Sequence, residues 1–266
     1  MLALAVSVSL LGAGLDSLKS SGIDTSASGL LRLGVGKLIF EQTLGYWADS
    51  TDSSSGQQIY SSLGANILIA NLPQLIVSAL YLLYNDLLTR LRLSVEWASF
   101  YLTAHPLRVS VPQGLQRSTG FLQLPLWLNV PLLAMMACLH WAISQSIFYA
   151  LVLSVNYSVD GGPTDFTVDG VGWSPLGLII SIAIGAALVL LLWLVCFLSK
   201  IPGGMPVARS CSAAISAACH GPEWDEEAPQ KLLAWGVVGR GVAEGTQHTA
   251  FSSGDVQPLS EGGIYT

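Results

Sequence analysis

Charged residues are scarce in this chain. Only 11% of its 266 residues are Asp, Glu, Lys or Arg, whereas a soluble domain carries about 25%. Three windows, Gly64–Asn85, Ser118–Val159 and Gly170–Ser199, contain no charged residue at all. A helix that crosses about 30 Å of hydrocarbon needs roughly 20 mainly apolar residues. Each window is long enough, so the sequence predicts an integral membrane protein in contact with the lipid bilayer.

Several function classes lack their usual signature here. The net charge is −6 and no basic stripe with interleaved aromatic residues occurs, so we do not expect nucleic acid as a partner. No nucleophile elbow, P-loop, HExxH motif or carboxylate pair is present, so we predict no catalytic residue and no cofactor. The four cysteines have neither metal-binding spacing nor a disulfide framework. These absences predict no metal site and favour a non-enzymatic role, while enzyme activity stays open.

Three membrane-spanning helices are predicted at about Leu63–Leu83, Pro131–Val155 and Pro175–Leu198. Pro73 should kink the first helix, because proline removes a backbone donor and clashes with the preceding turn. The third helix begins with a proline, which the first turn of a helix favours. The apolar segment Leu2–Leu15 is short for a span. A shortened fourth crossing, an interfacial segment and a cleaved signal therefore all stay open for it.

The predicted fold is an all-α transmembrane helical bundle with a mostly irregular C-terminal tail. Residues 1–62 would hold the N-terminal apolar segment and a polar loop, with a short amphipathic helix at Leu30–Trp47. Residues 63–198 would form the transmembrane region. Residues 199–266 would form the tail, with one short helix near Ser210–Cys219.

Basic residues predict the orientation of the spans. The connector between the first two spans holds four arginines, the loop after the second span holds no basic residue, and the tail holds four. Because Lys and Arg are retained on the cytoplasmic side, the connector and the tail are predicted to be cytosolic. The connector is expected to begin with a helix over Asp86–Thr103 along the membrane surface. The expected location is the plasma membrane or another membrane of the secretory pathway.

Polar side chains recur inside the first two spans. Steps of three or four residues place one set of five on a single face of the first helix. These residues are Asn71, Gln74, Ser78, Tyr81 and Asn85. The second span carries His140, Ser144 and Gln145. We expect the polar face of the first span to point into the bundle, where it would either bond neighbouring helices or line a path for a substrate or ion.

The third span carries small residues at steps of four: Gly177, Ser181 and Gly185. Such spacing lets helix backbones approach closely, so these residues are predicted to pack against another helix. Two function hypotheses follow from the polar and small residues. The first is a non-enzymatic scaffold or sensor that acts through membrane or cytosolic partners, which the tail would bind. The alternative is a transporter or channel module with a polar path between the first two spans, lined by Asn71, Gln74, Ser78, His140, Ser144 and Gln145.

Short runs of residues between about Leu63 and the C-terminus resemble one family. They are Ala70–Gln74, Glu96–Trp97, Leu107–Ser110, Pro112, Gly114, Gln116–Thr119, Leu124–Pro125, Leu139–Trp141, Ser144–Ser146, Trp173–Pro175, Ser212–His220, Trp235–Val238, Phe251–Ser253 and Gly263–Tyr265. In their order they are similar to a fungal family of multi-pass membrane proteins known by a domain-of-unknown-function label. Ala104–His105 departs from it, since the family tends to have basic residues there.

The resemblance carries structural expectations but no activity, because the family has none established. Its members resemble longer chains with an extra N-terminal membrane domain, so this chain is expected to be a C-terminal portion that lacks that domain. The run Ser212–His220 belongs to the family pattern although its composition is that of a linker. The resemblance therefore implies that this run folds against the membrane region or binds a partner.

Overall fold

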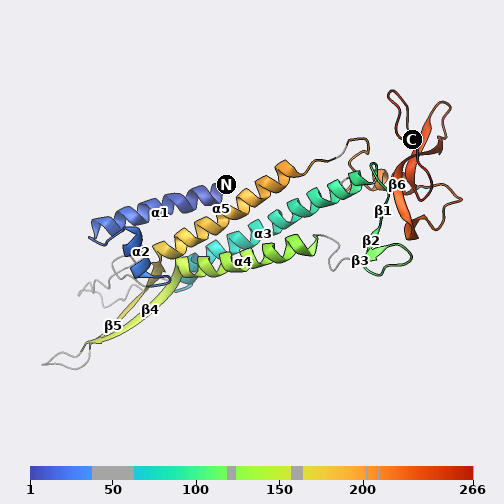
Figure 1. Cartoon of the computed structure of the whole chain (residues 1–266). Coiled ribbons are helices and arrows are strands. Elements are labelled where there is room, and N and C mark those ends of the chain that lie inside the picture. Colours follow the sequence, from blue (N-terminus) through green and yellow to red (C-terminus); the bar gives the residue numbers. More distant parts are fainter. Residues whose placement is uncertain (38–62, 119–123, 157–163, 202, 209, 266) are drawn as a thin grey trace. The chain divides into compact units, whose positions relative to one another are not determined.

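The computed structural model describes residues 1–37, 63–118, 124–156, 164–201, 203–208 and 210–265. The described chain contains both helices and strands, which occur in short groups along the sequence (Figure 1). The helices are α1 Leu2–Ser20, α2 Ala27–Leu33, α3 Leu63–Ser99, α4 Leu126–Ser146, α5 Pro175–Leu198, α6 Ser212–Cys219 and the 3₁₀ helix η2 Ala228–Gln230. The strands are β1 His105–Pro106, β2 Arg108–Val109, β3 Arg117–Ser118, β4 Ile147–Asn156, β5 Thr164–Trp173, β6 Leu232–Arg240 and β7 Gln247–Ser252.

Four of these helices, α1, α3, α4 and α5, are long and apolar enough to cross a membrane. Their apolar side chains are mostly not covered by the rest of the chain. In the most apolar window, 6% of the residues are buried in α1, 6% in α3, 33% in α4 and 17% in α5. In water, such an exposed apolar surface would be costly, since burial of apolar area is the main force that folds a soluble chain.

Long apolar helices lie in each of the segments for which the sequence predicted or allowed a span. Helix α5 has the predicted bounds, and α3 begins at the predicted residue. Helix α3 then continues without a break through Pro73 and through the first part of the connector to Ser99. Helix α1 extends to Ser20 and so exceeds the expected Leu2–Leu15. Of the amphipathic helix expected at Leu30–Trp47, only the overlap with α2 can be described, because residues 38–62 lie outside the described ranges.

The prediction of an all-α fold is wrong for the segment after α4. This helix begins at Leu126, includes Pro131 and ends at Ser146, whereas the predicted span ran to Val155. Strand β4 follows at once and pairs antiparallel with β5, from Ile147 opposite Trp173 to Asn156 opposite Thr164. The run after Ser146 is rich in β-branched and aromatic residues, which favour a strand. Apolar character alone cannot distinguish such a run from a buried helix.

The chain divides into two compact units. The first comprises residues 1–82 and 133–191, and the second comprises residues 83–132 and 192–266. In the first unit, α5 lies against α1 where Gly185 faces Leu4, because a Cβ on Gly185 would lie 3.0 Å from Leu4 Cδ2. The ring of Trp173, the last residue of β5, covers Gly14 of α1 and leaves no room there for a Cβ.

The second unit contains a three-stranded sheet in the order β1-β6-β7, with each neighbouring pair antiparallel. A bulge between Val237 and Gly239 interrupts the β6–β7 ladder. The short parallel pair β2–β3 belongs to the same unit. The tail therefore contributes strands of a sheet that the sequence did not predict, and the short helix expected near Ser210–Cys219 is present as α6.

The second unit has its own hydrophobic core. Phe100, Met205, Ala218, Leu233 and Trp235 are all buried in one cluster. Phe100 directly follows α3, Ala218 comes from α6, and Leu233 and Trp235 come from β6. Further apolar residues pack around this cluster: Trp97, Tyr101, Leu107, Ala228, Phe251 and Leu259. Residues that the composition marks as connector and tail thus form one folded body around the C-terminal end of α3.

Candidate functional site

The polar residues of the first predicted span do not all share one environment. Asn71 and Ser78 are exposed, whereas Gln74 is partly buried, and the buried positions of the same stretch are Asn66 and Ala70. Asn71 donates a hydrogen bond from Nδ2 to the Ile67 carbonyl at 2.8 Å, and Ser78 donates from Oγ to the Gln74 carbonyl at 3.0 Å. Each side chain bonds its own helix one turn back, which lowers the cost of apolar surroundings.

Further along α3, Tyr81 and Asn85 are partly buried. The expected inward face is therefore divided, with Gln74, Tyr81 and Asn85 on the more buried side and Asn71 and Ser78 outside it. This division follows from the helical period, because Asn71 and Ser78 each lie one residue, or about 100°, past a more buried position.

On α4, His140, Ser144 and Gln145 are partly buried. Ser144 donates from Oγ to the Trp141 carbonyl at 2.7 Å, and Gln145 donates from Nε2 to Ser144 Oγ at 3.4 Å. Gln145 Oε1 lies against Gly36, where a Cβ would come within 2.5 Å of it. Gly36 also has a φ of +68°, a conformation that favours glycine. The end of α4 thus contacts the segment after α2.

Two buried serines join α4 to α5. Ser146 Oγ and Ser181 Oγ lie 2.9 Å apart, and each hydroxyl also bonds a carbonyl one turn back, Ser146 to Ala142 at 2.6 Å and Ser181 to Gly177 at 2.9 Å. Close approach is possible at this point because Gly177 has no side chain: a Cβ there would lie 2.9 Å from the Gln145 carbonyl oxygen. Both serines are thereby satisfied without water.

Ser146 and Ser174 extend this junction, although sequence reasoning had selected neither of them. Ser174 donates from its backbone N–H to the Ser146 carbonyl at 2.8 Å and from Oγ to the Gly34 carbonyl at 3.4 Å. The runs Ser144–Ser146 and Trp173–Pro175 both belong to the pattern on which the family resemblance rests, and this was the available signal for the two serines. The geometry is that of packing: every hydroxyl at the junction is engaged with the chain itself.

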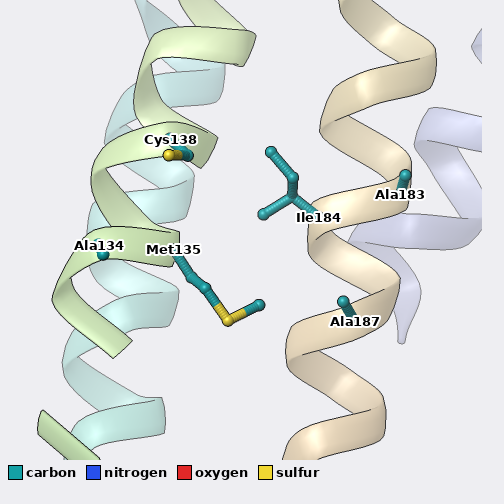
Figure 2. A pocket seen from close by; sticks show the side chains of 6 residues that line it. All are labelled: Ala134, Met135, Cys138, Ala183, Ile184 and Ala187. Carbon is teal, nitrogen blue, oxygen red and sulfur yellow. The ribbon is translucent and has the colours of Figure 1, made fainter. Parts of the chain in front are cut away.

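A hollow of about 480 Å³ lies between α4 and α5 in the first unit. Figure 2 shows Met135 of α4 and Ile184 of α5 extending into it from opposite sides. Its remaining lining residues are small: Ala134, Cys138, Ala183 and Ala187. No charged or hydrogen-bonding oxygen or nitrogen side chain lines this hollow, so it offers neither the ligands that ions need nor a polar path.

In the second unit, a carboxylate holds the end of β7. Asp225 is buried and its Oδ2 accepts hydrogen bonds from Ser252 Oγ at 2.8 Å and from the Ser253 backbone N–H at 2.6 Å. Ser253 Oγ donates to Oδ1 at 2.5 Å. Burial raises the pKa of Asp225, but the bonds from Ser253 and Ser252 and the charge of Lys231 outweigh it and hold the pKa below its usual value.

A second carboxylate ties α3 to the connector. Glu96 accepts two hydrogen bonds from Arg108 Nε, at 2.7 and 2.9 Å, and its Oε2 lies 2.6 Å from Arg108 Nη2. Arg117 Nη2 lies 3.4 Å from Glu96 Oε1. The Arg108 side chain is only 12% exposed. Two nitrogens of the Arg108 guanidinium thus contact the two oxygens of one carboxylate, and together with Arg117 this pairing fixes β2 and β3 beside the end of α3.

Neither carboxylate lies in an arrangement that suggests catalysis. Asp225 faces two serines and Glu96 faces two arginines, and each is explained by its structural contacts. Within the described ranges, no group of three or more His, Cys, Asp and Glu residues could hold a metal ion. The four cysteines are free and exposed.

Comparison with known proteins assigns the chain to a family. The model of the family called Domain of unknown function (DUF8419) matches residues 30–261. Nothing matches among the curated proteins or among the solved structures. The match begins at Leu30 within α2 and ends at Glu261 in the second unit, and so it includes the Glu96, Asp225 and Ser146 contacts. The chain therefore belongs to the family Domain of unknown function (DUF8419).

Proposed function

We propose that this chain is a multi-pass integral membrane protein that works without catalysis, as a scaffold or sensor whose second unit binds partner proteins. The observation that carries the proposal is the position of the α3 terminus. Trp97, near the end of α3, and Phe100, just after it, pack in the core formed with Trp235 of β6. A helix long and apolar enough to span a bilayer thus ends inside a folded body that contains charged and polar residues.

The length of α3 supports this proposal. At 1.5 Å per residue its 37 residues measure about 55 Å, which exceeds the roughly 30 Å of hydrocarbon in a bilayer. The uncharged window Gly64–Asn85 accounts for about 33 Å. The remaining stretch, Asp86–Ser99, carries Asp86, Arg90, Arg92 and Glu96 and would emerge from the membrane.

The same proposal includes the orientation and location. Arginines after Asn85 and basic residues in the tail favour the cytosol for the second unit, because Lys and Arg near the ends of spans are retained there. The β4–β5 hairpin would then lie on the opposite side, and α1 would provide a fourth crossing. The proposed location is the plasma membrane or another membrane of the secretory pathway, and the family resemblance suggests a fungal origin.

A transport role is not proposed, because the hollow between α4 and α5 is apolar and the hydroxyls of Ser144, Ser146 and Ser181 bond the chain itself.

The exposed cysteines Cys211 and Cys219 allow the membrane part of the proposal to be tested. In sealed, right-side-out vesicles, an impermeant maleimide should label both only after permeabilisation. The full chain should stay with the membrane in alkaline carbonate. Release by carbonate, or labelling of intact vesicles, would refute the membrane or the orientation.

The scaffold part requires its own experiment on the full chain. Trp235→Ala should loosen the core of the second unit while leaving the spans intact. Val242 is fully exposed in the β6–β7 turn, so Val242→Ser is a matched control on the same sheet. Proximity labelling from the C-terminus should lose its specific neighbours in Trp235→Ala and keep them in Val242→Ser, with both variants still resistant to carbonate. Unchanged neighbours in Trp235→Ala would contradict the proposal.

A further inference from the structure

Four arginines lie on α3 and the following connector, and three of them have a carboxylate partner. Arg90 pairs with Asp86, with 2.9 Å between Nε and Oδ2, and both Arg108 and Arg117 pair with Glu96. Arg92 has no carboxylate within ion-pair distance among the described residues. Its Nε is buried and has no hydrogen-bond partner there. An unpaired guanidinium N–H of this kind is costly unless a group outside the chain accepts its hydrogen bond.

A second polar atom on the same face of α3 has the same property. Thr89 Oγ1 is buried and lacks a hydrogen-bond partner within the described ranges. Thr89 and Arg92 are three residues apart, a spacing that places them side by side on a helix. Together they present a hydroxyl and a guanidinium, which are donors suited to phosphate oxygens.

An aromatic ring borders these two donors. The Arg92 guanidinium carbon lies 5.9 Å from the centroid of the Trp127 ring, within the range of a cation–π contact. Trp127 is in the first turn of α4 and is 67% exposed. A tryptophan at the end of a helix about 31 Å long is placed where tryptophans anchor helices at the membrane–water interface.

The depth of Arg92 agrees with that of Trp127. Arg92 lies seven residues after Asn85, the last residue of the uncharged window, and thus about 10 Å beyond it along α3. Helix tilt shortens this distance along the membrane normal. Both residues then lie at the level of the lipid headgroups, where the acceptors in greatest supply are the phosphates of phospholipids.

We propose that Thr89, Arg92 and Trp127 form a site for the phosphate of an anionic phospholipid. Arg92 donates to the phosphate oxygens, Thr89 adds a donor one turn earlier, and Trp127 covers the guanidinium while its ring rests at the interface. The inference depends on the proposed membrane location. It goes beyond that location by assigning three side chains to one ligand chemistry.

Native mass spectrometry of the purified full chain in detergent can test this site. Phosphatidylserine and phosphatidylcholine would be added in equal amounts, and the fraction of protein that retains each would be measured. The wild type should retain phosphatidylserine preferentially. Arg92→Gln should lower the phosphatidylserine occupancy about tenfold, because a charge-assisted bond contributes about 1.5–3 kcal/mol and 1.4 kcal/mol corresponds to a factor of ten. Trp127→Leu should lower it a few-fold.

Arg90→Gln is the matched control, since it removes the same charge two residues earlier from an arginine already paired with Asp86. The phosphatidylserine occupancy of Arg90→Gln should stay within about twofold of the wild-type value, because an exposed ion pair contributes little. Equal losses in Arg90→Gln and Arg92→Gln would overturn the site, and so would full competition by inorganic phosphate. If Arg92→Gln does not fold, Thr89→Val takes its place, and unchanged retention in that variant overturns the proposal.

Carbonate extraction shows whether a negative result refutes the lipid site alone or the proposed membrane location as well. Retention of Arg92→Gln in carbonate-washed membranes, together with unchanged phosphatidylserine occupancy, would refute the site alone. Release of the wild type by carbonate would refute the membrane location and the site with it.

Discussion

The indole of Trp97 meets the phenyl ring of Phe251 edge to face, with centroids 5.2 Å apart and planes at 88°. Phe251 makes a similar contact with Phe100, at 5.3 Å and 82°. The Trp97 indole also donates from Nε1 to the Pro206 carbonyl at 3.1 Å. The end of α3 is thereby bound to β7 and to the segment after α5, and aromatic contacts of this type add to the stabilisation from burial alone.

Trp97→Ala should destabilise the second unit by about 2–4 kcal/mol, because it removes the ring contact, the hydrogen bond and a partly buried aromatic side chain. Trp97→Phe keeps a ring and should lose only about 1 kcal/mol with the hydrogen bond. Amide hydrogen exchange in β6 and β7 of the detergent-solubilised chain measures both effects. Equal protection in Trp97→Ala and wild type would show that these contacts contribute little.

Glu96→Gln should destabilise the same unit by about 1–3 kcal/mol, because it leaves the largely buried Arg108 guanidinium without its counter-charge. Arg117 is 53% exposed, so Arg117→Gln is the natural comparison and should change the unfolding free energy by less than about 0.5 kcal/mol. Urea-dependent proteolysis of the segment that holds β2 and β3 reports both variants. If Arg117→Gln lowered the unfolding free energy more than Glu96→Gln does, the stabilisation would depend on Arg117 and not on the Glu96–Arg108 pair.

The stability of the second unit should fall in acid through Asp225. Its pKa in the folded chain lies below the ordinary value of 3.8, so the unfolded chain binds the proton more readily. The stabilisation is therefore complete above about pH 4 and is lost as the pH falls through the folded pKa. Hydrogen exchange of the β7 amides measures this loss: their protection against exchange should fall as the pH is lowered from 7 to 3.

Asp225→Asn should remove most of this pH dependence and destabilise the unit by about 1–3 kcal/mol at pH 7, because the amide replaces one acceptor oxygen with a donor facing Ser253. Glu244→Gln, at an exposed position of the β6–β7 turn, should leave both quantities unchanged. An acid transition of the same size in Asp225→Asn would assign it to another group.

Gly177→Ala should weaken the α4–α5 junction, because its Cβ would meet backbone atoms that cannot move aside, whereas Gly185→Ala meets only the end of the flexible Leu4 side chain. We expect losses of about 1–3 kcal/mol for Gly177→Ala and under 1 kcal/mol for Gly185→Ala. Thermal unfolding in detergent, followed by size-exclusion chromatography, compares the two. If Gly177→Ala loses no more thermal stability than Gly185→Ala, the two helices do not depend on a close approach at Gly177.

The sequence was most informative where structure depends on local composition. Helix α5 could be placed because Pro175–Leu198 is mainly apolar, contains no charged residue and begins with a favoured proline. The end of α4 could not, because the residues from Ile147 are as apolar as those before Ser146. The strand forms there with β5 as its partner, whereas the sequence predicted the residues of β5 to lie in a loop. Pairing of two segments is not visible in the composition of either one.

The candidate site residues show the same limit. The polar positions of α3 could be named, but not which of them would be buried, because that depends on neighbouring helices. Glu96 lies 12 residues from Arg108, and Asp225 lies 28 residues from Ser253. Contacts over such separations leave no spacing pattern. The short runs that carried the resemblance contain Glu96, Arg108 and Ser253, but not Asp225.

The β4–β5 ladder begins directly at the ends of two helices, with Ile147, the residue after α4, opposite Trp173, two residues before α5. Axial sliding of α4 against α5 would therefore have to re-register ten residue pairs at once. A slip by one residue would turn every side chain of the slipped strand to the other face of the hairpin. The register of the hairpin therefore resists a shift of α4 along the axis of α5, because the pairing of β4 and β5 would have to break for the shift to occur.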